Sequence, residues 1–363
     1  MPTFSTLIKP ASSNCNLGCT YCFYSDVISC RTTKSYGLMD YNTSFRIIDR
    51  AFEHINHSGN LIFAFQGGEP TLAGIDFFKA FTEYANAKKT KTVNINYSIQ
   101  TNGLLIDSDW CMLFKQNHFL VGLSFDGTPD IHNFLRQNSS KRVLEAAKLL
   151  HKHNVDFNIL TVVSKQVARH PKKVFDFLKQ FDYLQFIPCL EPFNAIERSV
   201  YSLTPQLYAD FLKVLFRLWY KELINGRYIS IRLFDNIIQS ITGQMPEQCG
   251  MLGICQMQYV IEADGSVYPC DFYCVDEYNA GNINNASFEQ LYNTECVKRF
   301  LQDAGEQNPI CKNCSFQTIC NGGCKRYRHF YFAVENYCPF KDFLSETVNS
   351  FVHLSKYIQR VIK

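Results

Sequence analysis

The sequence predicts an α/β protein: a partial, TIM-like (β/α)6 barrel followed by a cysteine-rich domain that binds metal. Short apolar runs alternate with segments of helical period from residue 5 to about residue 225. Beyond residue 240 this alternation stops, and eight of the 16 cysteines recur at spacings typical of metal ligands. Alternating strands and helices form parallel sheets through right-handed crossovers. We expect a barrel at 1–235, a metal-binding domain at 236–340 and a helical tail at 341–363.

The expected elements follow the periodicity of the apolar residues. Six strands are expected at 5–9, 61–65, 93–99, 120–125, 157–163 and 184–188. Helices are expected at 41–56, 74–88, 107–116, 140–153, 170–180 and 204–224. Functional side chains of such barrels gather at the C-terminal ends of the strands. After the barrel, Ala263, Asp264 and Gly265 lie between two apolar runs and indicate a hairpin turn.

Charge and composition exclude several classes of protein. The 363 residues carry a net charge of +3, without long runs of either sign, which argues against nucleic acid or an anionic membrane as the main partner. The N-terminus has no export signal, and no apolar run reaches transmembrane length. These features predict a cytoplasmic protein. In that reducing compartment, cysteines at such spacings favour metal ligation over disulfides.

The first motif is CxxxCxxC, formed by Cys15, Cys19 and Cys22 directly after the first strand. Three thiolates on one compact loop can bind three irons of a [4Fe-4S] cluster and leave the fourth iron open. A zinc site is the alternative, but it needs four ligands, and neither Cys30 nor His54 lies close by in the sequence. Buried cysteines that pack as small apolar residues are a further alternative.

A second motif, Gln66-Gly67-Gly68-Glu69-Pro70, follows the second strand. Glycines permit close approach to the backbone, and Glu69 supplies a carboxylate. With this motif and the cysteine triad, the chain resembles the radical S-adenosylmethionine (SAM) superfamily, which also has an aromatic residue at the position of Tyr21.

That resemblance implies a cluster whose open iron is chelated by SAM, and a 5'-deoxyadenosyl radical that abstracts hydrogen from the substrate. It implies cofactor contacts at Tyr21, Gly68 and Glu69. It extends these contacts to Ser124, Arg136 and Leu190, which from their sequence positions alone are equally ordinary residues of a barrel rim.

The C-terminal cysteines suit two four-cysteine clusters or two zinc sites, and spacing alone does not choose between them. Their order resembles the SPASM domain, a twin-cluster appendage of radical SAM enzymes that modify peptides. The resemblance implies one auxiliary cluster on Cys249, Cys255, Cys270 and Cys324 and another on Cys311, Cys314, Cys320 and Cys338, hence three [4Fe-4S] clusters in all. No role is assigned to Cys30, Cys111, Cys189, Cys274 and Cys296, of which Cys111 and Cys189 are expected in the core.

Longer segments, among them LIKPASSNCNLGCTYCFY, AFQGGEPTLAG, SIQTNG and DGSVYPCDFY, resemble the anaerobic sulfatase-maturating enzymes. These oxidise a Cys or Ser in a sulfatase CxPxR or SxPxR motif to Cα-formylglycine. The implied partners are an unfolded sulfatase polypeptide and an electron donor such as ferredoxin or flavodoxin.

Completing that oxidation requires a base beside an electron acceptor, and Asp271 directly follows the expected ligand Cys270. The resemblance implies that Asp271 accepts the proton. The alternative is that Asp271 caps the hairpin or hydrogen-bonds a cluster sulfur. Tyr24 and Gln66 are candidate contacts for the target peptide, with rim packing as the alternative.

Two other functions compete with this interpretation. A maturase of ribosomal peptides would form thioether or carbon–carbon links with the same clusters. Such enzymes often carry an N-terminal recognition domain, and only fourteen residues precede Cys15 here, which together with Asp271 favours sulfatase maturation. Candidates from another functional class are a non-catalytic iron–sulfur electron carrier and a binding protein whose fold is stabilised by zinc. The six-unit barrel with its GGEP motif argues against this class, because a carrier needs no cavity for a nucleoside.

Overall fold

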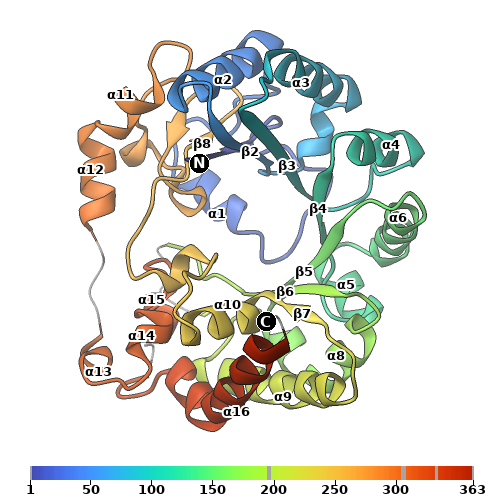
Figure 1. Cartoon of the computed structure of the whole chain (residues 1–363), viewed down its shortest axis with the longest axis vertical. Helices are drawn as coiled ribbons and strands as arrows, with labels where there is room; N and C mark the ends of the chain where they lie inside the picture. The colour runs from blue at the N-terminus through green and yellow to red at the C-terminus, as the bar shows by residue number, and fades with distance from the viewer. Residues whose placement is uncertain (1, 194–197, 304–307, 332–333, 362–363) are drawn as a thin grey trace. The chain divides into compact units, whose positions relative to one another are not determined.

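The computed structural model describes residues 2–193, 198–303, 308–331 and 334–361 (Figure 1). The chain forms two compact units, each assembled from three segments. Unit 1 contains Met1–Ser124, Asn133–Asn158 and Gln256–Gln302, and unit 2 contains Phe125–His132, Ile159–Cys255 and Asp303–Lys363. The domain bounds expected from the sequence stay a prediction.

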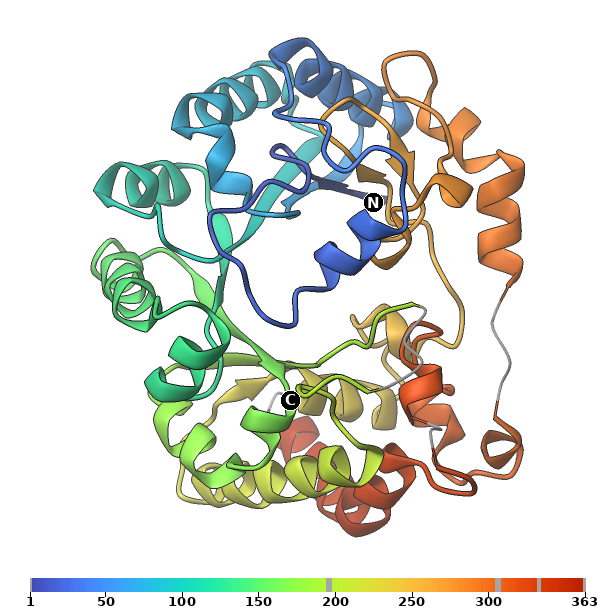
Figure 2. The ribbon, with the colours of Figure 1, turned by 180° about the vertical axis from the view of Figure 1, so that it is seen from behind.

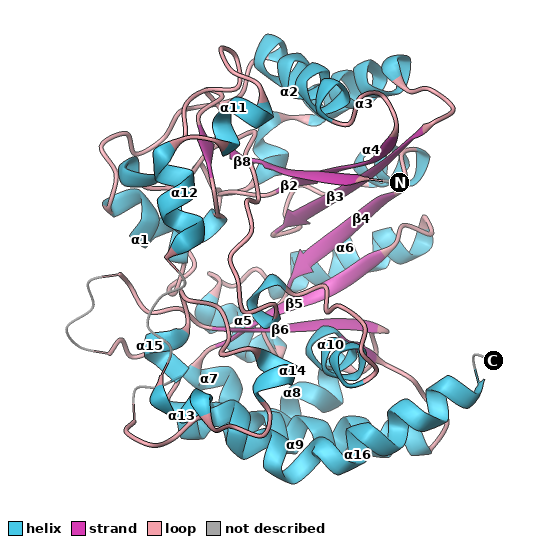
Figure 3. Cartoon of the chain, turned by 60° about the vertical axis from the view of Figure 1, so that its left-hand side comes forward, coloured by secondary structure: helices cyan, strands magenta, loops and turns pink. Residues whose placement is uncertain are grey.

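Unit 1 is built on a sheet with the strand order β4-β3-β2-β1-β8-β9 (Figure 3). The strands are β1 (Thr3–Ile8), β2 (Gly59–Phe65), β3 (Val93–Thr101), β4 (Phe119–Ser124), β8 (Val260–Ile261) and β9 (Val267–Tyr268). All neighbouring strands are parallel except the β8–β9 hairpin. The hairpin therefore extends the N-terminal sheet, because β8 pairs with β1.

Side-chain alternation explains how this sheet forms its core. In β2, buried residues occupy every second position, so that Phe63 and Phe65 point to the same face. The rings of Phe63 and Phe65 each lie 5.1 Å from that of Phe81, which comes from helix α3 (Ile75–Lys88). Aromatic side chains thus pack the helix against the sheet.

Helices follow the strands of unit 1 in the order expected of parallel crossovers. The helices are α1 (Phe23–Ser29), α2 (Tyr41–His54), α3, α4 (Ser108–Gln116), α6 (Ser140–Lys152), α11 (Phe288–Tyr292) and α12 (Glu295–Gln302), with 3-10 turns η1 (Pro70–Ala73), η3 (Asp271–Tyr273) and η4 (Asp276–Tyr278). Figure 1 shows α2 and α3 side by side, in agreement with their contacts. Helix α2 begins where Asp40 accepts a hydrogen bond from the Thr43 N–H. Helix α5 (Pro129–Leu135) has residues in both units.

Unit 2 contains three parallel strands in the order β7-β6-β5. These are β5 (Phe157–Val163), whose first two residues belong to unit 1, β6 (Tyr183–Pro188) and β7 (Ser230–Ile231). The helices are α7 (Lys165–Ala168), α8 (Pro171–Leu178), α9 (Pro205–Ile224), α10 (Arg232–Ile241), α13 (Pro309–Lys312), α14 (Gln317–Cys320), α15 (Arg328–Tyr331) and α16 (Pro339–Val361), with a 3-10 turn η2 (Cys249–Met251). Figure 2 shows α16, in red, lying along α9.

The six expected strands and the six expected helices are confirmed to within three residues at each end. The hairpin around Gly265 is confirmed as well, with φ +88° at this glycine. The sequence did not predict the short elements α1, α5, α7 and β7, because each is too short to establish a period. Among the described helices, none combines the length and the apolar character needed to cross a membrane.

Candidate active site

Three strand ends of unit 1 place polar side chains in one row. Ile8 of β1 is in register with Phe65 of β2 and with Ile261 of β8. The next residues, Gln66, Lys9 and Glu262, therefore leave the sheet side by side at its C-terminal edge. Backbone hydrogen bonds continue the pairing there, from the Gln66 N–H to the Ile8 carbonyl oxygen (2.9 Å) and from the Lys9 N–H to that of Ile261 (2.8 Å).

Asp271 lies against this row and is buried, with 5% of its surface exposed. Its Oδ2 accepts hydrogen bonds from the Tyr24 hydroxyl (2.7 Å) and from Nε2 of Gln66 (3.1 Å). Its Oδ1 lies 2.9 Å from Nζ of Lys9. The structure thus brings together Asp271, Tyr24 and Gln66, which sequence analysis had selected separately, and adds Lys9, which it had not.

The charges at this edge balance one another. Burial opposes the ammonium of Lys9, but Asp271, Cys274 and Glu262 outweigh it and raise the pKa of Lys9. Burial likewise opposes the carboxylate of Glu262, but Lys9 and Arg31 lower its pKa below the ordinary value. Both groups are therefore charged. Burial, followed by the charge of Asp271, raises the pKa of Tyr24, so its hydroxyl keeps the proton that it donates.

The cysteine loop follows the same strand end. The thiol of Cys15 accepts hydrogen bonds from the Leu17 N–H (3.4 Å) and from the Asn102 side-chain amide (3.8 Å). Cys19 accepts one from the Arg136 guanidinium (3.8 Å). Donors aimed at sulfur stabilise thiolates and tune a metal that they hold. Cys22, the N-cap residue of α1, donates its N–H to the Cys19 carbonyl oxygen (3.2 Å).

Gly68 is required by the chain's own packing. A Cβ at this position would lie 2.1 Å from the carbonyl oxygen of Asn14. The Gly68 N–H donates to the carbonyl oxygen of Ser12 (2.9 Å), and the Glu69 N–H to that of Asn14 (2.7 Å). The segment that leads into the cysteine loop therefore occupies the space that the missing side chain provides, where sequence analysis had expected a ligand.

Glu69 is buried and joins the GGEP motif to the third strand. Its Oε1 accepts hydrogen bonds from the backbone and hydroxyl of Thr71 (3.0 and 2.5 Å) and from the Thr101 hydroxyl (2.8 Å). Its Oε2 accepts one from the Asn102 N–H (2.7 Å). Burial raises the pKa of Glu69, and these donors act against that effect. Asn102 thus connects Glu69 to Cys15, a role that only its position in the segment SIQTNG could have suggested.

The other predicted cofactor contacts have different surroundings. Ser124 is the buried last residue of β4. The guanidinium carbon of Arg136 lies 5.5 Å from the centre of the Tyr21 ring, which places Arg136 and Tyr21 together beside Cys19. Leu190 belongs to unit 2, two residues beyond β6.

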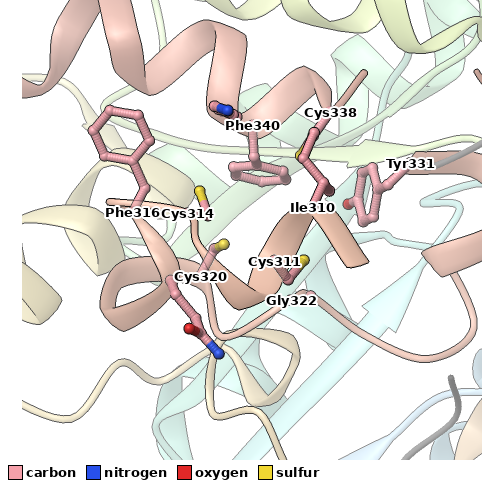
Figure 4. Close-up of a pocket in the computed structure, with 12 residues that line it drawn as sticks. Ile310, Cys311, Cys314, Phe316, Cys320, Gly322, Tyr331, Cys338 and Phe340 are labelled. Atoms are coloured by element: carbon pink, nitrogen blue, oxygen red, sulfur yellow. The ribbon is translucent and has the colours of Figure 1, made fainter. Parts of the chain in front are cut away.

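Four cysteines of unit 2 line one cavity. Cys311, Cys314, Cys320 and Cys338 share its wall with apolar side chains that include Phe340 (Figure 4). Figure 4 shows their sulfur atoms arranged around a common space. Burial raises the pKa of Cys320 to about 11, and charge on the other three thiols adds to the effect because they are close. Four thiols in an apolar pocket are the donor set of an iron–sulfur cluster.

A second group in unit 2 contains Cys249, Cys255 and Cys324. A Cβ on Gly250 would lie 3.1 Å from Cβ of Cys324. Burial raises the pKa of Cys324 to about 11, and both Cys249 and Cys255 contribute to the shift. The three thiols are thus neighbours. Cys270, the fourth expected ligand, belongs to unit 1.

The remaining cysteines do not join these groups. Cys111 and Cys189 are buried in the core, as expected from their apolar segments. Cys274 is fully buried and accepts a hydrogen bond from Lys9 Nζ (3.3 Å). Among the described residues, no three His, Cys, Asp or Glu side chains converge closely enough to hold a single metal ion.

Comparisons with known proteins match two separate segments of the chain to two families. Residues 10–178 match the family described as the radical SAM superfamily, and residues 249–315 match an iron–sulfur cluster-binding domain. The chain is 44% identical to a cysteine-type anaerobic sulfatase-maturating enzyme of Clostridium novyi, over 98% of both proteins. It is 30% identical to a serine-type enzyme of Bacteroides thetaiotaomicron, over 89% of this chain and 82% of that protein.

A solved structure gives the same result for the fold. The structure of native anSMEcpe with bound AdoMet and Cp18Cys peptide superposes with a TM-score of 0.90 at 39% identity, covering 98% of this chain and all of that one.

Proposed function

The chain belongs to the anaerobic sulfatase-maturating enzymes, a family of radical SAM proteins with iron–sulfur clusters, and we propose that its natural target is a cysteine in a CxPxR motif. The identity to the cysteine-type relative, 44% against 30% for the serine-type, supports this choice. A solved relative carries AdoMet and the Cp18Cys peptide, which supports SAM and a cysteine-containing peptide as ligands here.

The arrangement around Asp271 is the observation that carries the mechanism. The bound cofactors supply one-electron chemistry, namely the removal of a hydrogen atom from Cβ and an acceptor for a second electron. The target thiol must also lose its proton, and the thiol becomes far more acidic as that electron leaves. Asp271 is the residue that accepts this proton, because its carboxylate is buried, ion-paired and held by Tyr24 and Gln66. Water then converts the C=S group to the aldehyde and releases hydrogen sulfide.

The remaining site residues have narrower tasks in this proposal. Cys15, Cys19 and Cys22 hold the cluster that binds SAM. Tyr21, Gly68, Glu69, Ser124, Arg136 and Leu190 form the SAM site, in which Gly68 and Glu69 act by fixing the cysteine loop. Tyr24 and Gln66 contact the target peptide while they hold Asp271.

The cysteines of the C-terminal half complete a set of three clusters. Cys311, Cys314, Cys320 and Cys338 hold one auxiliary cluster, which their shared cavity supports. Cys249, Cys255 and Cys324 hold the other, and for Cys270 ligation rests on the resemblance to the SPASM domain. We retain 1–235, 236–340 and 341–363 as the bounds of the barrel, the SPASM domain and the tail. The further partners are an unfolded sulfatase chain and a low-potential donor such as ferredoxin or flavodoxin.

Anaerobic turnover tests this proposal directly. The protein is reconstituted with iron and sulfide and then incubated with SAM, a reductant and peptides that contain CxPxR or SxPxR. We expect 5'-deoxyadenosine together with an aldehyde product, detected by mass spectrometry after hydrazine labelling, and faster conversion of the cysteine peptide. Cleavage of SAM without aldehyde from either peptide would refute sulfatase maturation. A cross-linked product would instead support the rival peptide maturase.

An Asp271→Asn variant tests the assignment of the base. The amide keeps the shape of the side chain but cannot accept the proton. We expect normal SAM cleavage and a loss of aldehyde of about 100-fold or more, within the range typical of general base catalysis. Aldehyde formation at the wild-type rate would remove Asp271 from this role.

A further inference from the structure

Lys9 is the buried cation paired with Asp271, and the proposed mechanism gives it no task of its own. It follows β1 directly, and its side chain is 2% exposed. Lysines are almost never fully buried unless they are paired, because removing the ammonium from water is costly. Its burial at the edge where Asp271 lies therefore calls for an explanation.

The ammonium of Lys9 has three N–H donors, and three acceptors surround it. Oδ1 of Asp271 lies 2.9 Å away, Sγ of Cys274 lies 3.3 Å away and Oε1 of Glu262 lies 3.6 Å away. These acceptors come from the hairpin and the turn that follows it. Cys274 accepts the hydrogen bond and the two carboxylates form ion pairs with the ammonium, so contacts with three groups fix the position of Nζ.

The acceptors are in turn fixed by other residues. Glu262 receives the Arg31 guanidinium on Oε1 and the Ser12 hydroxyl on Oε2, both at 2.7 Å. The thiol of Cys274 donates to the carbonyl oxygen of Cys270 at 3.6 Å. Two cations and two carboxylates balance within this network. The ammonium is therefore a rigid support, connected through Cys274 to the residue directly before Asp271.

We propose that Lys9 is a positioning residue for proton transfer: its ion pair with Oδ1 fixes the orientation of the Asp271 carboxylate that receives the proton of the target thiol. This inference rests on the proposed function of Asp271. Lys9 keeps its own proton throughout, and the S–H bond breaks as the O–H bond to Asp271 forms. Tyr24 and Gln66 donate to Oδ2, so the carboxylate is held at both of its oxygens.

A positioning role and a purely structural role make different predictions. A lysine that only balances charge affects folding and cluster content, and therefore every activity of the enzyme. A lysine that orients Asp271 affects only the step that Asp271 performs. The informative quantity is therefore the coupling ratio, the amount of aldehyde formed per 5'-deoxyadenosine, measured with the CxPxR peptide and normalised to iron content.

The experiment is a double-mutant cycle on reconstituted full-length protein with Lys9→Met, Asp271→Asn and the double variant. We expect Lys9→Met to keep SAM cleavage and to lower the coupling ratio about tenfold or more. In the Asp271→Asn background the same change should alter the ratio by less than about twofold, because residues that act as one unit are not additive. Lys213→Met is the matched control, since Lys213 also pairs with a carboxylate, that of Asp342 (2.6 Å), outside this network. It should keep the wild-type ratio.

Each outcome decides the question. A wild-type ratio in Lys9→Met overturns the inference, and so does an equal drop in both backgrounds. If Lys9→Met fails to take up iron, Lys9 supports the fold and every activity of the enzyme. That result overturns the inference, whether or not the double variant regains its iron, because removal of Asp271's charge then only restores the balance. Wild-type protein that cleaves SAM but forms no aldehyde refutes the proposed function itself.

Discussion

Replacing Gly68 by alanine should detach the cysteine loop from the second strand. The added Cβ would lie 2.1 Å from the Asn14 carbonyl oxygen, whereas a carbon and an oxygen normally approach to no less than about 3.3 Å. The segment before Cys15 must therefore move by about 1 Å. That movement breaks the two backbone hydrogen bonds from Gly68 and Glu69 to this segment, which measure 2.9 and 2.7 Å.

The cost follows from these losses. Overpacking costs about 1–3 kcal/mol, and each buried hydrogen bond left unmade costs about 1–3 kcal/mol. We expect a total of about 3–9 kcal/mol, a large share of the roughly 5–15 kcal/mol by which domains are stable. Because the strain falls on the residues next to Cys15, the first cluster should be lost before the fold.

Iron content and 5'-deoxyadenosine formation measure this effect, and urea unfolding of the apoprotein measures the free energy. The control is Gly226→Ala, where a Cβ has no neighbour within 4 Å and only the left-handed backbone, with φ +86°, is penalised. That penalty is about 1–2 kcal/mol, so the control should retain its iron. A Gly68→Ala protein with full iron content and normal SAM cleavage would refute the steric argument.

Three further predictions concern other parts of the site. Above pH 4.5, the ordinary pKa of this carboxyl, Glu262→Gln should be less stable than wild type, because a group with a lowered pKa stabilises the fold only while it is ionised. The difference in stability should shrink as the pH falls below 4.5. Urea unfolding midpoints measured across this pH range check the prediction, and a difference independent of pH would contradict it. Asn102→Ala removes an N–H donor to Cys15 and should lower the reduction potential of the first cluster. A redox titration monitored by electron spin resonance measures this potential, and an unchanged value would contradict the prediction. Cys320→Ala should remove about four irons per chain, retain SAM cleavage and reduce aldehyde formation, and a full iron count would contradict the assignment.

The periodicity of the apolar residues was sufficient to predict the longer strands and helices between residues 3 and 224. Strands such as β5 (Phe157–Val163) are short β-branched runs, and helices such as α9 (Pro205–Ile224) are long and amphipathic, so local sequence determines both. The cysteine groups were equally accessible, because the spacing of metal ligands reflects the short loops that hold them.

Local sequence patterns could not predict which residues surround and hold Asp271. Lys9 at the end of an apolar strand has the sequence appearance of a surface residue, and its burial depends on Glu262 and Cys274, which lie more than 250 positions away. Asn102 was overlooked for the same reason, since its partners Glu69 and Cys15 follow other strands. A ligand was expected to approach Gly68 closely, whereas the backbone that approaches it in the structure belongs to the chain itself.

The pairing of β1 with β8 also constrains the order in which the protein folds during its synthesis. The N-terminal strand leaves the ribosome first, but its neighbour on one side arrives only after residue 261. Until then that edge of β1 is unpaired, and an open strand edge invites wrong partners. The Lys9 ammonium meanwhile has neither of its carboxylate partners, so the end of β1 must stay in water. Contacts of such high sequence separation form slowly. The edge that carries Lys9 and Glu262 is therefore among the last parts of unit 1 to fold, and a chain truncated before the hairpin cannot assemble it.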